Sequence, residues 1–386
     1  MVESHRIPVR LVICVDGTWC GPDGIPGDYQ GNISNVYRIY SAVKTGLVVD
    51  GSGPRLQKKE YWKGLGSDEP PLKRHITAVF ANGCEALIRQ IYQFCLENTL
   101  DDQDEIYFFG FSRGAYVVRA LAGLLHHLGR IAIRGSFEET YNDGLRWYKE
   151  ILFPSTPPLA GSLNLFFSRQ EGKPPRVRYI GAFDTVKARP RDQLHQFTSI
   201  KSVEHFRHAL ALNEHRNYLT FEWWVCEDCH PWDSSEYPQK SYQEAWFLGS
   251  HGDMGGANAK DGLSLYPLQW ILSEAKECGL VVHETKLSPP LDGIDCTTEL
   301  VFPTPMTGLN GEFPKVMQIK NGIHTKHWDL FEVHKQDRYR IVFNLGAIGA
   351  SFLGTSPREP FKDTKLVGYR SDGKFTYELV QITKQN

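Results

Sequence analysis

The sequence predicts an α/β fold with a mainly parallel β-sheet, helices on both of its faces, and inserted cap segments. Short apolar runs rich in β-branched and aromatic residues alternate along the chain with amphipathic helical patterns. This alternation is typical of parallel strands joined by helices. Several of the apolar runs also stop directly at a polar residue, as strands do where they reach the ligand-binding edge of an open sheet.

Length and composition allow one large domain or two modest ones, and we predict a single domain covering residues 1–386. The chain has 41% hydrophobic residues and a formal net charge of -2, from 43 Lys and Arg against 45 Asp and Glu. This balance argues against nucleic acid as a partner. The first residues lack the apolar core of a signal peptide, and no uncharged stretch reaches the ~20 residues that span a bilayer. Eight cysteines without dense spacing favour reduced thiols, so we expect a soluble, cytoplasmic protein.

The first half of the chain predicts two strands and two helices. Residues 9–15 read as a buried strand that ends at Asp16. Apolar residues recur at helical spacing within residues 75–98. Residues 105–111 form a second strand, and a helix follows at 113–128, closed by a glycine.

The second half continues the alternation. Residues 176–183 predict a strand that ends at Asp184, and a strand over 244–250 ends at His251. We expect helices within residues 203–216 and 265–280.

Two long, poorly periodic segments, about 136–175 and 187–243, are predicted as insertions that cover the site. Their large aromatic residues either form an apolar acyl pocket or pack the insertions themselves. These residues are Trp147, Tyr148, Phe153, Phe166, Phe167, Phe197, Trp223 and Trp224.

Ser112 is the candidate nucleophile. It is the centre of Gly-Phe-Ser-Arg-Gly, residues 110–114, placed between a strand and a helix. The G-x-S-x-G pentapeptide alone is a weak signal, but a nucleophile elbow requires this strand, serine and helix order, with small residues around the strained turn. The competing interpretation is that the glycines only let the strand and the helix pack closely.

A serine nucleophile needs a base, and the base needs an orienting acid. In this arrangement the three residues follow the order Ser, Asp or Glu, His. Asp184 and His251 satisfy that order, and each directly follows an apolar strand. The alternatives are Asp253 as the acid, and His324 or His327 as the base.

Six stretches of the chain together resemble the uncharacterised α/β-hydrolase domain family that includes the lipase effectors of type VI secretion and many fungal proteins. They are DGTW (16–19), DEIYFFGFSRGAYVVRALAGLL (104–125), AFDTV (182–186), HALALNEHR (208–216), WFLGSHGDMGGA (246–257) and the helix pattern at 265–280. The resemblance implies an α/β-hydrolase-like fold and a serine hydrolase of the esterase or lipase type.

The resemblance also implies roles for particular residues. The triad falls on Ser112, Asp184 and His251. The turn after the first strand is suited to donate the N–H of Gly17 or Thr18 to the oxyanion, with the Arg113 N–H as second donor and Asp16 bracing the loop.

The sequence departs from the family in two ways. Met254 stands where the family's H-x-D-V-G-G motif has valine, and the chain is too short to contain the large membrane-associating additions of the bacterial effectors. We therefore expect a small-molecule or lipid ester of medium size as substrate. The alternatives are a phospholipase that acts on membrane lipids, acyl transfer to an alcohol, and a binding protein that keeps the hydrolase fold without turnover.

Other motifs give no support for a metal or cofactor. Cys226, Cys229 and His230 suggest zinc but lack a fourth ligand nearby, and Asp16, Asp23 and Asp28 do not follow calcium-loop spacing. No phosphate-binding glycine loop is present. We expect neither metal nor cofactor.

Overall fold

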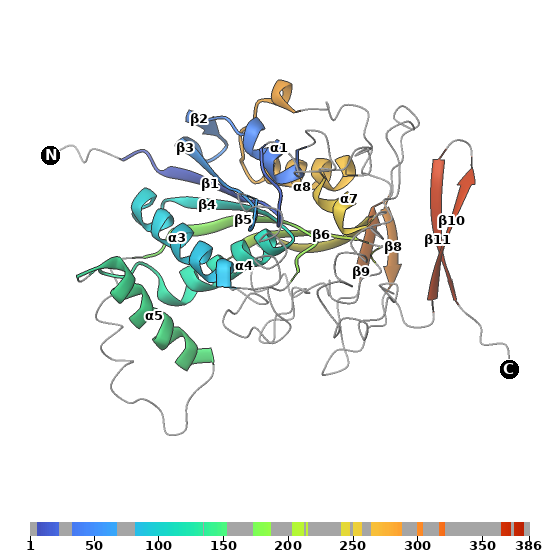
Figure 1. Ribbon diagram of the computed structural model, residues 1–386. Coiled ribbons are helices and arrows are strands. Elements are labelled where there is room, and N and C mark those ends of the chain that lie inside the picture. The colour runs from blue at the N-terminus through green and yellow to red at the C-terminus, as the bar shows by residue number, and fades with distance from the viewer. Residues whose placement is uncertain are drawn as a thin grey trace.

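The computed structural model describes residues 6–22, 33–67, 82–133, 135–152, 173–186, 203–211, 214, 241–247, 250–256, 264–287, 299–303, 316–320, 364–371 and 374–381. Its strands are β1 (Val9–Val15), β2 (Gly46–Asp50), β3 (Gly53–Trp62), β4 (Glu105–Phe111), β5 (Arg176–Phe183), β6 (Val203–Ala211), β7 (Ser241–Phe247), β8 (Glu299–Pro303), β9 (Val316–Lys320), β10 (Thr364–Ser371) and β11 (Lys374–Gln381). The first nine form one sheet, and β10 and β11 form a separate hairpin (Figure 1).

The large sheet has the order β2-β3-β1-β4-β5-β6-β7-β9-β8. Every neighbouring pair from β3 to β9 is parallel, while the edge strands β2 and β8 run antiparallel to their neighbours. This confirms the predicted α/β fold with a mainly parallel sheet. The chain leaves β1 toward β3 and then returns to place β4 on the other side of β1. Ligand sites in such sheets lie at this switch point, beyond the carboxyl ends of the strands.

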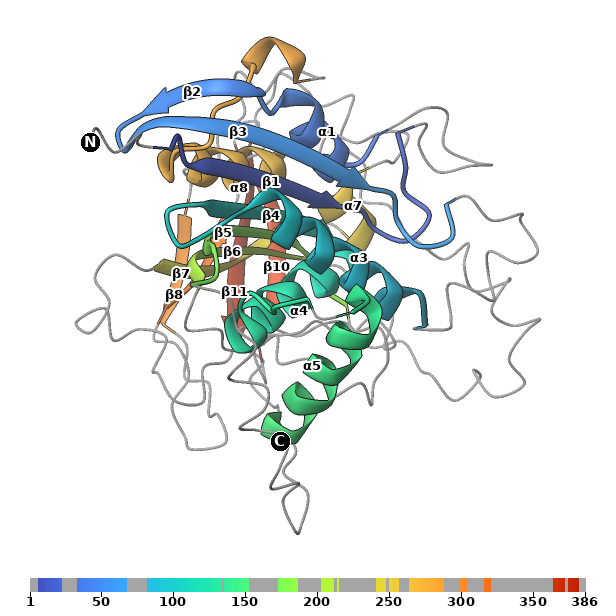
Figure 2. The same ribbon diagram turned by 90° about the vertical axis from the view of Figure 1, so that its left-hand side faces the viewer.

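Helices cover both faces of the sheet. They are α1 (Asn35–Ala42), α3 (Asn82–Asn98), α4 (Arg113–Leu128), α5 (Phe137–Leu152), α7 (His251–Gly255) and α8 (Leu265–Glu277), with a 3-10 turn η1 (Glu284–Lys286). The helices α3, α4 and α5 lie on one face, and α1 and α8 lie on the other (Figures 1 and 2).

Strand β1 divides the interior into two cores. Leu11 and Ile13 belong to the core with α3 and α4, whereas Val12 and Cys14 belong to the core with α1 and α8. Alternate side chains of a strand point to opposite faces, so a strand covered on both faces is apolar throughout. This explains why residues 9–15 are apolar except for Arg10, which lies near the amino end of the strand.

The helix predicted within residues 203–216 is wrong, because residues 203–211 form the strand β6. Val203, Phe206 and Leu210 stand at helical spacing, but β6 lies between two parallel strands and is buried on both faces. Such a strand shows no polar alternation that would identify it.

The two predicted insertions also contain elements of the main fold. The segment 136–175 includes α5, whose residues Trp147 and Tyr148 belong to the core with α4, and the segment 187–243 includes β6. These two aromatics therefore pack the core and do not line a cap. The other six aromatics named above lie outside the described residues, and the single domain with cap segments stays a prediction.

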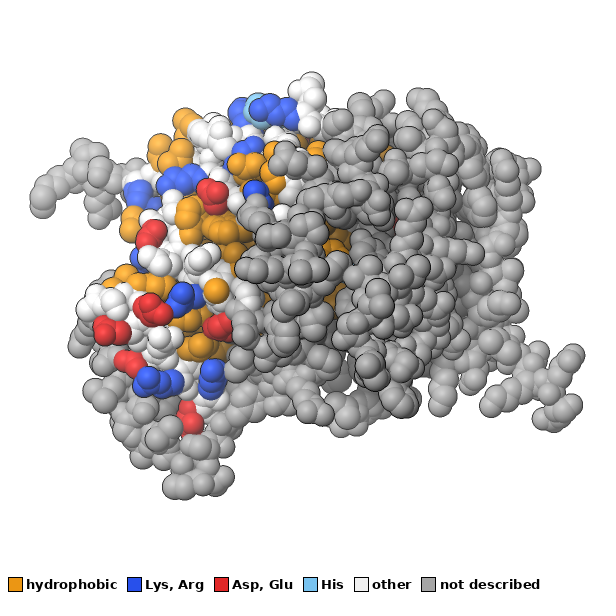
Figure 3. Space-filling model, viewed as in Figure 1, with side chains coloured by type: hydrophobic (Ala, Val, Ile, Leu, Met, Phe, Trp, Pro, Cys, Tyr) orange, Lys and Arg blue, Asp and Glu red, His pale blue; other side chains and the backbone are white. Residues whose placement is uncertain are grey.

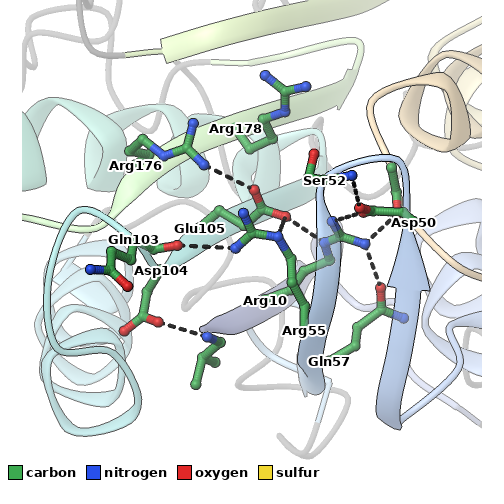
Figure 4. Close-up of polar contacts among 12 residues, drawn as sticks. Arg10, Asp50, Ser52, Arg55, Gln57, Gln103, Asp104, Glu105, Arg176 and Arg178 are labelled. Atoms are coloured by element: carbon green, nitrogen blue, oxygen red, sulfur yellow. Dashed lines mark hydrogen bonds and ion pairs between the residues drawn. The ribbon is translucent and has the colours of Figure 1, made fainter. Parts of the chain in front are cut away.

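An ion-pair network joins the amino ends of the strands (Figure 4). Arg10 Nε donates to Glu105 Oε1 at 2.5 Å, and Arg10 also pairs with Asp50. Arg55 and Arg176 approach the same Glu105 carboxylate at 3.5 and 3.4 Å. The Arg10 and Glu105 side chains are 1% and 3% exposed. The network thus ties together β1, β3, β4 and β5 at the edge opposite to the strand ends that carry the predicted site.

Apolar side chains gather at the β2 edge of the sheet (Figure 3). Leu47 and Leu56 are register partners on β2 and β3, and both are exposed, as is Val49. The described helices leave this part of the sheet uncovered. Across the described residues, we find no helix with the length and apolar character needed to cross a membrane.

Candidate active site

Ser112 lies on a strained turn between β4 and α4. Its backbone angles are φ +56° and ψ −120°, in the left-handed half of the map that non-glycine residues rarely adopt. A Cβ on Gly110 would lie 2.6 Å from the Ala115 Cα, and one on Gly114 would lie 2.2 Å from the Val15 carbonyl oxygen. Glycine is therefore required at both positions for the turn to close against the end of β1.

The structure brings the side chains of Ser112, His251 and Asp184 together. Ser112 Oγ lies 2.9 Å from His251 Nε2, and His251 Nδ1 lies 2.6 Å from Asp184 Oδ2. The three residues are 7%, 8% and 0% exposed. A carboxylate next to Nδ1 favours a proton on that nitrogen, so Nε2 is left with a lone pair that can accept the serine proton.

Asp184 is held in an uncommon backbone conformation at the end of β5, with φ +42°. Its N–H donates to the Ala209 carbonyl at 2.8 Å, and its Oδ1 accepts the N–H of Ala211 at 3.1 Å. Both partners belong to β6. The carboxylate therefore contacts the strand through one oxygen and His251 through the other.

Backbone hydrogen bonds also join the serine turn to the aspartate turn. The Ser112 N–H donates to the Phe183 carbonyl at 2.9 Å, and the Val186 N–H donates to the Ser112 carbonyl at 3.3 Å. These bonds extend the pairing of β4 and β5 beyond the strand ends. The distance between Ser112 and Asp184 is thus set by the spacing of neighbouring strands.

His251 is the first residue of the short helix α7. Ser250 and Asp253 form a capping box there, in which the Ser250 N–H donates to Asp253 Oδ2 at 2.8 Å. Glu214 Oε2 accepts the His251 N–H at 3.2 Å, and the Phe111 ring lies 4.8 Å from the imidazole. Asp253 therefore orders the start of α7, and the carboxylate that meets the imidazole is that of Asp184.

Helix α7 is attached to α1 and α8. Asn35 Nδ2 donates to the carbonyls of Met254 and Ser264 at 2.9 and 2.8 Å, and Ser34 forms an isolated bridge with Gly256. Met254, at the position where the family motif has valine, is fully buried in the core beneath α1 and α8. The histidine is thus positioned by contacts from the α1 face of the sheet.

Asp16 is a buried carboxylate at the end of β1 that accepts three hydrogen bonds. Its Oδ1 accepts the Gly17 N–H at 2.7 Å, and its Oδ2 accepts the hydroxyls of Ser34 at 2.5 Å and Tyr61 at 2.7 Å. Burial raises the Asp16 pKa to about 6, although all three hydrogen bonds act in the opposite direction. Asp16 therefore holds the loop after β1 by direct contacts.

The same contacts change the expectation for the oxyanion donors. Because the Gly17 N–H is directed at Asp16 in this structure, we propose Thr18 as the donor on this loop. Within the described part of the chain, the buried Thr18 hydroxyl oxygen has no hydrogen-bond partner. Arg113 is the first residue of α4, so its backbone N–H lies at the positive end of the helix dipole.

The sequence assigned no role to four of the described polar residues whose side chains contact the site. Ser34 and Tyr61 gave no signal, because their contact with Asp16 depends on how α1 and β3 pack around β1. His208 and Glu214 lie in the stretch HALALNEHR, which contributed to the family resemblance without indicating a function for either residue.

Several sequence candidates cannot be placed, since they lie outside the described residues. Among the residues that are described, no three metal-ligand side chains lie together. The candidates outside are His324, His327, Cys226, Cys229, His230, Asp23 and Asp28.

Comparison with known proteins places this chain in a family. The family model for the catalytic domain of type VI secretion (T6SS) phospholipase effectors, Tle1-like, matches residues 9–274. An uncharacterised protein of Saccharomyces cerevisiae is 27% identical over 234 residues, which cover 54% of this chain and 31% of the yeast protein.

Two solved structures show weaker likeness. An uncharacterised protein from Pseudomonas aeruginosa has a TM-score of 0.44 and 18% identity, over 74% of this chain and 48% of that one. The Tle1 effector bound to the VgrG spike has a TM-score of 0.37 and 16% identity, over 65% and 51% of the two chains. The chain thus matches about half or less of each of these relatives. The family match, however, covers well over half of this chain and confirms the resemblance read from its motifs, so the chain belongs to the Tle1-like T6SS phospholipase effector catalytic-domain family.

Proposed function

We propose that this protein is a serine hydrolase that cleaves carboxylic esters, with Ser112 as nucleophile, His251 as general base and Asp184 as the orienting acid. The observation that carries the proposal is the continuous contact from Ser112 Oγ through the imidazole to the Asp184 carboxylate, with the serine on a strained turn after a strand. Membership of a family named for phospholipase effectors supports the same class of reaction.

In the proposed reaction, Ser112 Oγ attacks the ester carbonyl carbon while its proton moves to His251 Nε2. The carbonyl oxygen becomes an oxyanion, which the N–H groups of Thr18 and Arg113 stabilise. Asp184 stabilises the charged imidazole. The tetrahedral intermediate then breaks its bond to the alcohol, which leaves with the proton from His251, and an acyl group remains on Ser112.

Water completes the cycle. His251 removes a proton from a water molecule while the oxygen of that water attacks the acyl carbon. The imidazole then passes the proton to Ser112 Oγ as the carboxylic acid is released. No step requires a metal, so we expect activity to survive chelators.

For the substrate, we propose a soluble or singly presented ester of medium size over bulk membrane phospholipid. The sequence shows no segment that combines a strongly apolar helical face with Lys and Arg enrichment, as an interfacial helix has. The second candidate is membrane phospholipid, which the name of the family favours.

A fluorophosphonate probe tests the nucleophile. The wild type should be labelled, whereas Ser112→Ala should not, and Ser52→Ala, which changes an exposed serine, should label like the wild type. Hydrolysis of p-nitrophenyl esters should fall in Ser112→Ala to about a thousandth or less of the wild-type kcat. Equal turnover by wild type and Ser112→Ala would rule out the mechanism, and a wild type without labelling or turnover would favour a binding protein.

The substrate is tested by comparing p-nitrophenyl esters of increasing chain length with phospholipid vesicles. We expect serine-dependent hydrolysis of the medium-chain esters with little release of fatty acid from vesicles. The reverse result, strong release from vesicles that is lost in Ser112→Ala, would establish the phospholipase alternative.

A further inference from the structure

The end of β6 contacts the turn that carries Asp184 at three points. Asp184 donates its N–H to the Ala209 carbonyl and accepts the Ala211 N–H, and the imidazole of His208 accepts the N–H of Thr185 through Nε2 at 3.0 Å. His208 is fully buried on the strand next to the acid. The Thr185 N–H thus bonds to a side chain, whereas the N–H groups of the residues before and after it bond to backbone carbonyls.

This hydrogen bond fixes the chemical state of His208. A backbone N–H can only donate, so Nε2 must carry a lone pair, and the neutral ring has its proton on Nδ1. A side chain without an acceptor would leave the buried Thr185 N–H unpaired. An unsatisfied buried donor costs about 1–3 kcal/mol.

The contact matters because the Asp184 backbone is strained. A φ of +42° at a residue with a side chain costs on the order of 1–3 kcal/mol and persists only where the surroundings hold it. Release of the Thr185 N–H would allow the peptide after Asp184 to rotate. The Asp184 carboxylate would then move relative to His251 Nδ1, which it now approaches at 2.6 Å.

We propose that His208 is a positioning residue, whose neutral imidazole holds the turn after β5 so that Asp184 meets His251. The proposal rests on the proposed function, because it assigns His208 to the support of the acid in that mechanism. His208 itself does not touch the reacting atoms.

The test compares two substitutions at this position. His208→Gln offers a carbonyl oxygen close to the place of Nε2, whereas His208→Leu has a similar reach and no acceptor. We expect His208→Leu to lower kcat about 10- to 100-fold, the scale expected for a displacement of about 1 Å at an active site, with KM within about twofold. His208→Gln should keep kcat within about threefold of the wild type.

The control is His205→Gln, on the same strand but paired in register with Tyr179, away from the Asp184 turn. It should keep the wild-type kcat. A folded His208→Leu with wild-type kcat would overturn the proposal, as would equal losses in the Leu and Gln variants, because a role in packing alone does not require an acceptor.

A second measurement covers the case in which His208→Leu does not fold. Nitrogen-15 NMR of the wild type should show His208 neutral, with its proton on Nδ1, and a proton on Nε2 would overturn the proposal. Failure of the proposed function is distinguishable, since it would appear as equal activity of wild type and Ser112→Ala. Failure of this inference alone would leave Ser112→Ala inactive and His208→Leu fully active.

Discussion

At the scale of single residues, the two candidate acids have different partners. The Asp184 carboxylate contacts the His251 imidazole, whereas the Asp253 carboxylate accepts the Ser250 N–H. A first prediction follows. Asp184→Asn should lower kcat by about 10⁴-fold, because an amide cannot orient the imidazole as the carboxylate does. Asp253→Asn should mainly weaken α7 and should leave more than a tenth of kcat. Steady-state kinetics with p-nitrophenyl esters measures both, and the opposite ranking would assign the acid to Asp253.

The side chains that the structure brings together could be predicted from the sequence, while their hydrogen bonds could not. Ser112, Asp184 and His251 follow apolar runs, and the end of a strand is visible in a sequence. The direction of the Gly17 N–H was not visible. It depends on the Asp16 carboxylate, whose orientation is set by Ser34 and Tyr61 on other elements. Long-range contacts of this kind leave no local pattern.

Asp16 leads to a second prediction, on stability and pH. Its folded pKa of about 6 lies above the ordinary value of 3.8, so the folded protein binds the proton more tightly than the unfolded chain does. The contribution of Asp16 to stability is therefore greatest below pH 4 and declines as the pH rises to about 6. The decline is on the order of 3 kcal/mol for about two pKa units.

Urea unfolding of wild type and Asp16→Asn between pH 4 and pH 7.5 measures this change. The free energy of unfolding of the wild type, minus that of the variant, should decrease from pH 4 to about pH 6 and then level off. A difference that is constant with pH would contradict the assignment of the raised pKa to Asp16.

At the scale of elements, the strands β1, β4 and β5 and the helices α4 and α8 were predictable, because a strong apolar pattern and a clear stop coincide in each. Strand β6 was not. It is central in the sheet, so burial on both faces removes the alternation that distinguishes a strand from a helix. The nucleophile elbow, in contrast, was predictable from the sequence. Only glycine fits where this turn packs closely against its neighbours, and that requirement appears in the sequence as a motif.

The close approach at the elbow gives a third prediction. Ala is usually better than Gly in a helix by about 1 kcal/mol, yet Gly114→Ala should destabilise the protein, because its Cβ would lie 2.2 Å from the Val15 carbonyl oxygen. It should also lower kcat by displacing Ser112. Gly51→Ala is the matched control, since a Cβ there meets nothing within 4 Å. Thermal unfolding and ester hydrolysis test both, and a Gly114→Ala variant as stable and active as wild type would refute the elbow packing.

At the scale of the whole molecule, the carboxyl ends of the strands form one edge of the sheet and their amino ends form the opposite edge, and the two edges hold different groups. The carboxyl edge holds Ser112 and Asp184, and the amino edge holds the ion-pair network around Glu105. A buried arginine that loses its carboxylate is costly, because its charge remains out of water. We therefore expect stability and catalysis to respond separately to substitutions at the two edges.

The fourth prediction follows from this separation. Glu105→Gln should lower the free energy of unfolding by about 3–5 kcal/mol, because it leaves Arg10 and Arg55 with less compensation. The kcat of the folded variant should stay near the wild-type value. Glu138→Gln, which breaks the exposed pair with Arg89, should change stability by less than about 1 kcal/mol. A large fall in kcat for folded Glu105→Gln would show that the two edges are coupled.

The backbone bonds between the serine and aspartate turns have a consequence for the order in which the site opens on warming. The amides of Ser112 and Val186 bond across β4 and β5, whereas those of Met254 and Gly256 bond within α7 and its cap. Amides that bond between central strands open at a higher free energy than those of a one-turn helix, which opens locally. Hydrogen exchange at rising temperature should therefore show α7 released first, so that activity disappears while Ser112 and Asp184 still lie side by side at the end of a protected sheet.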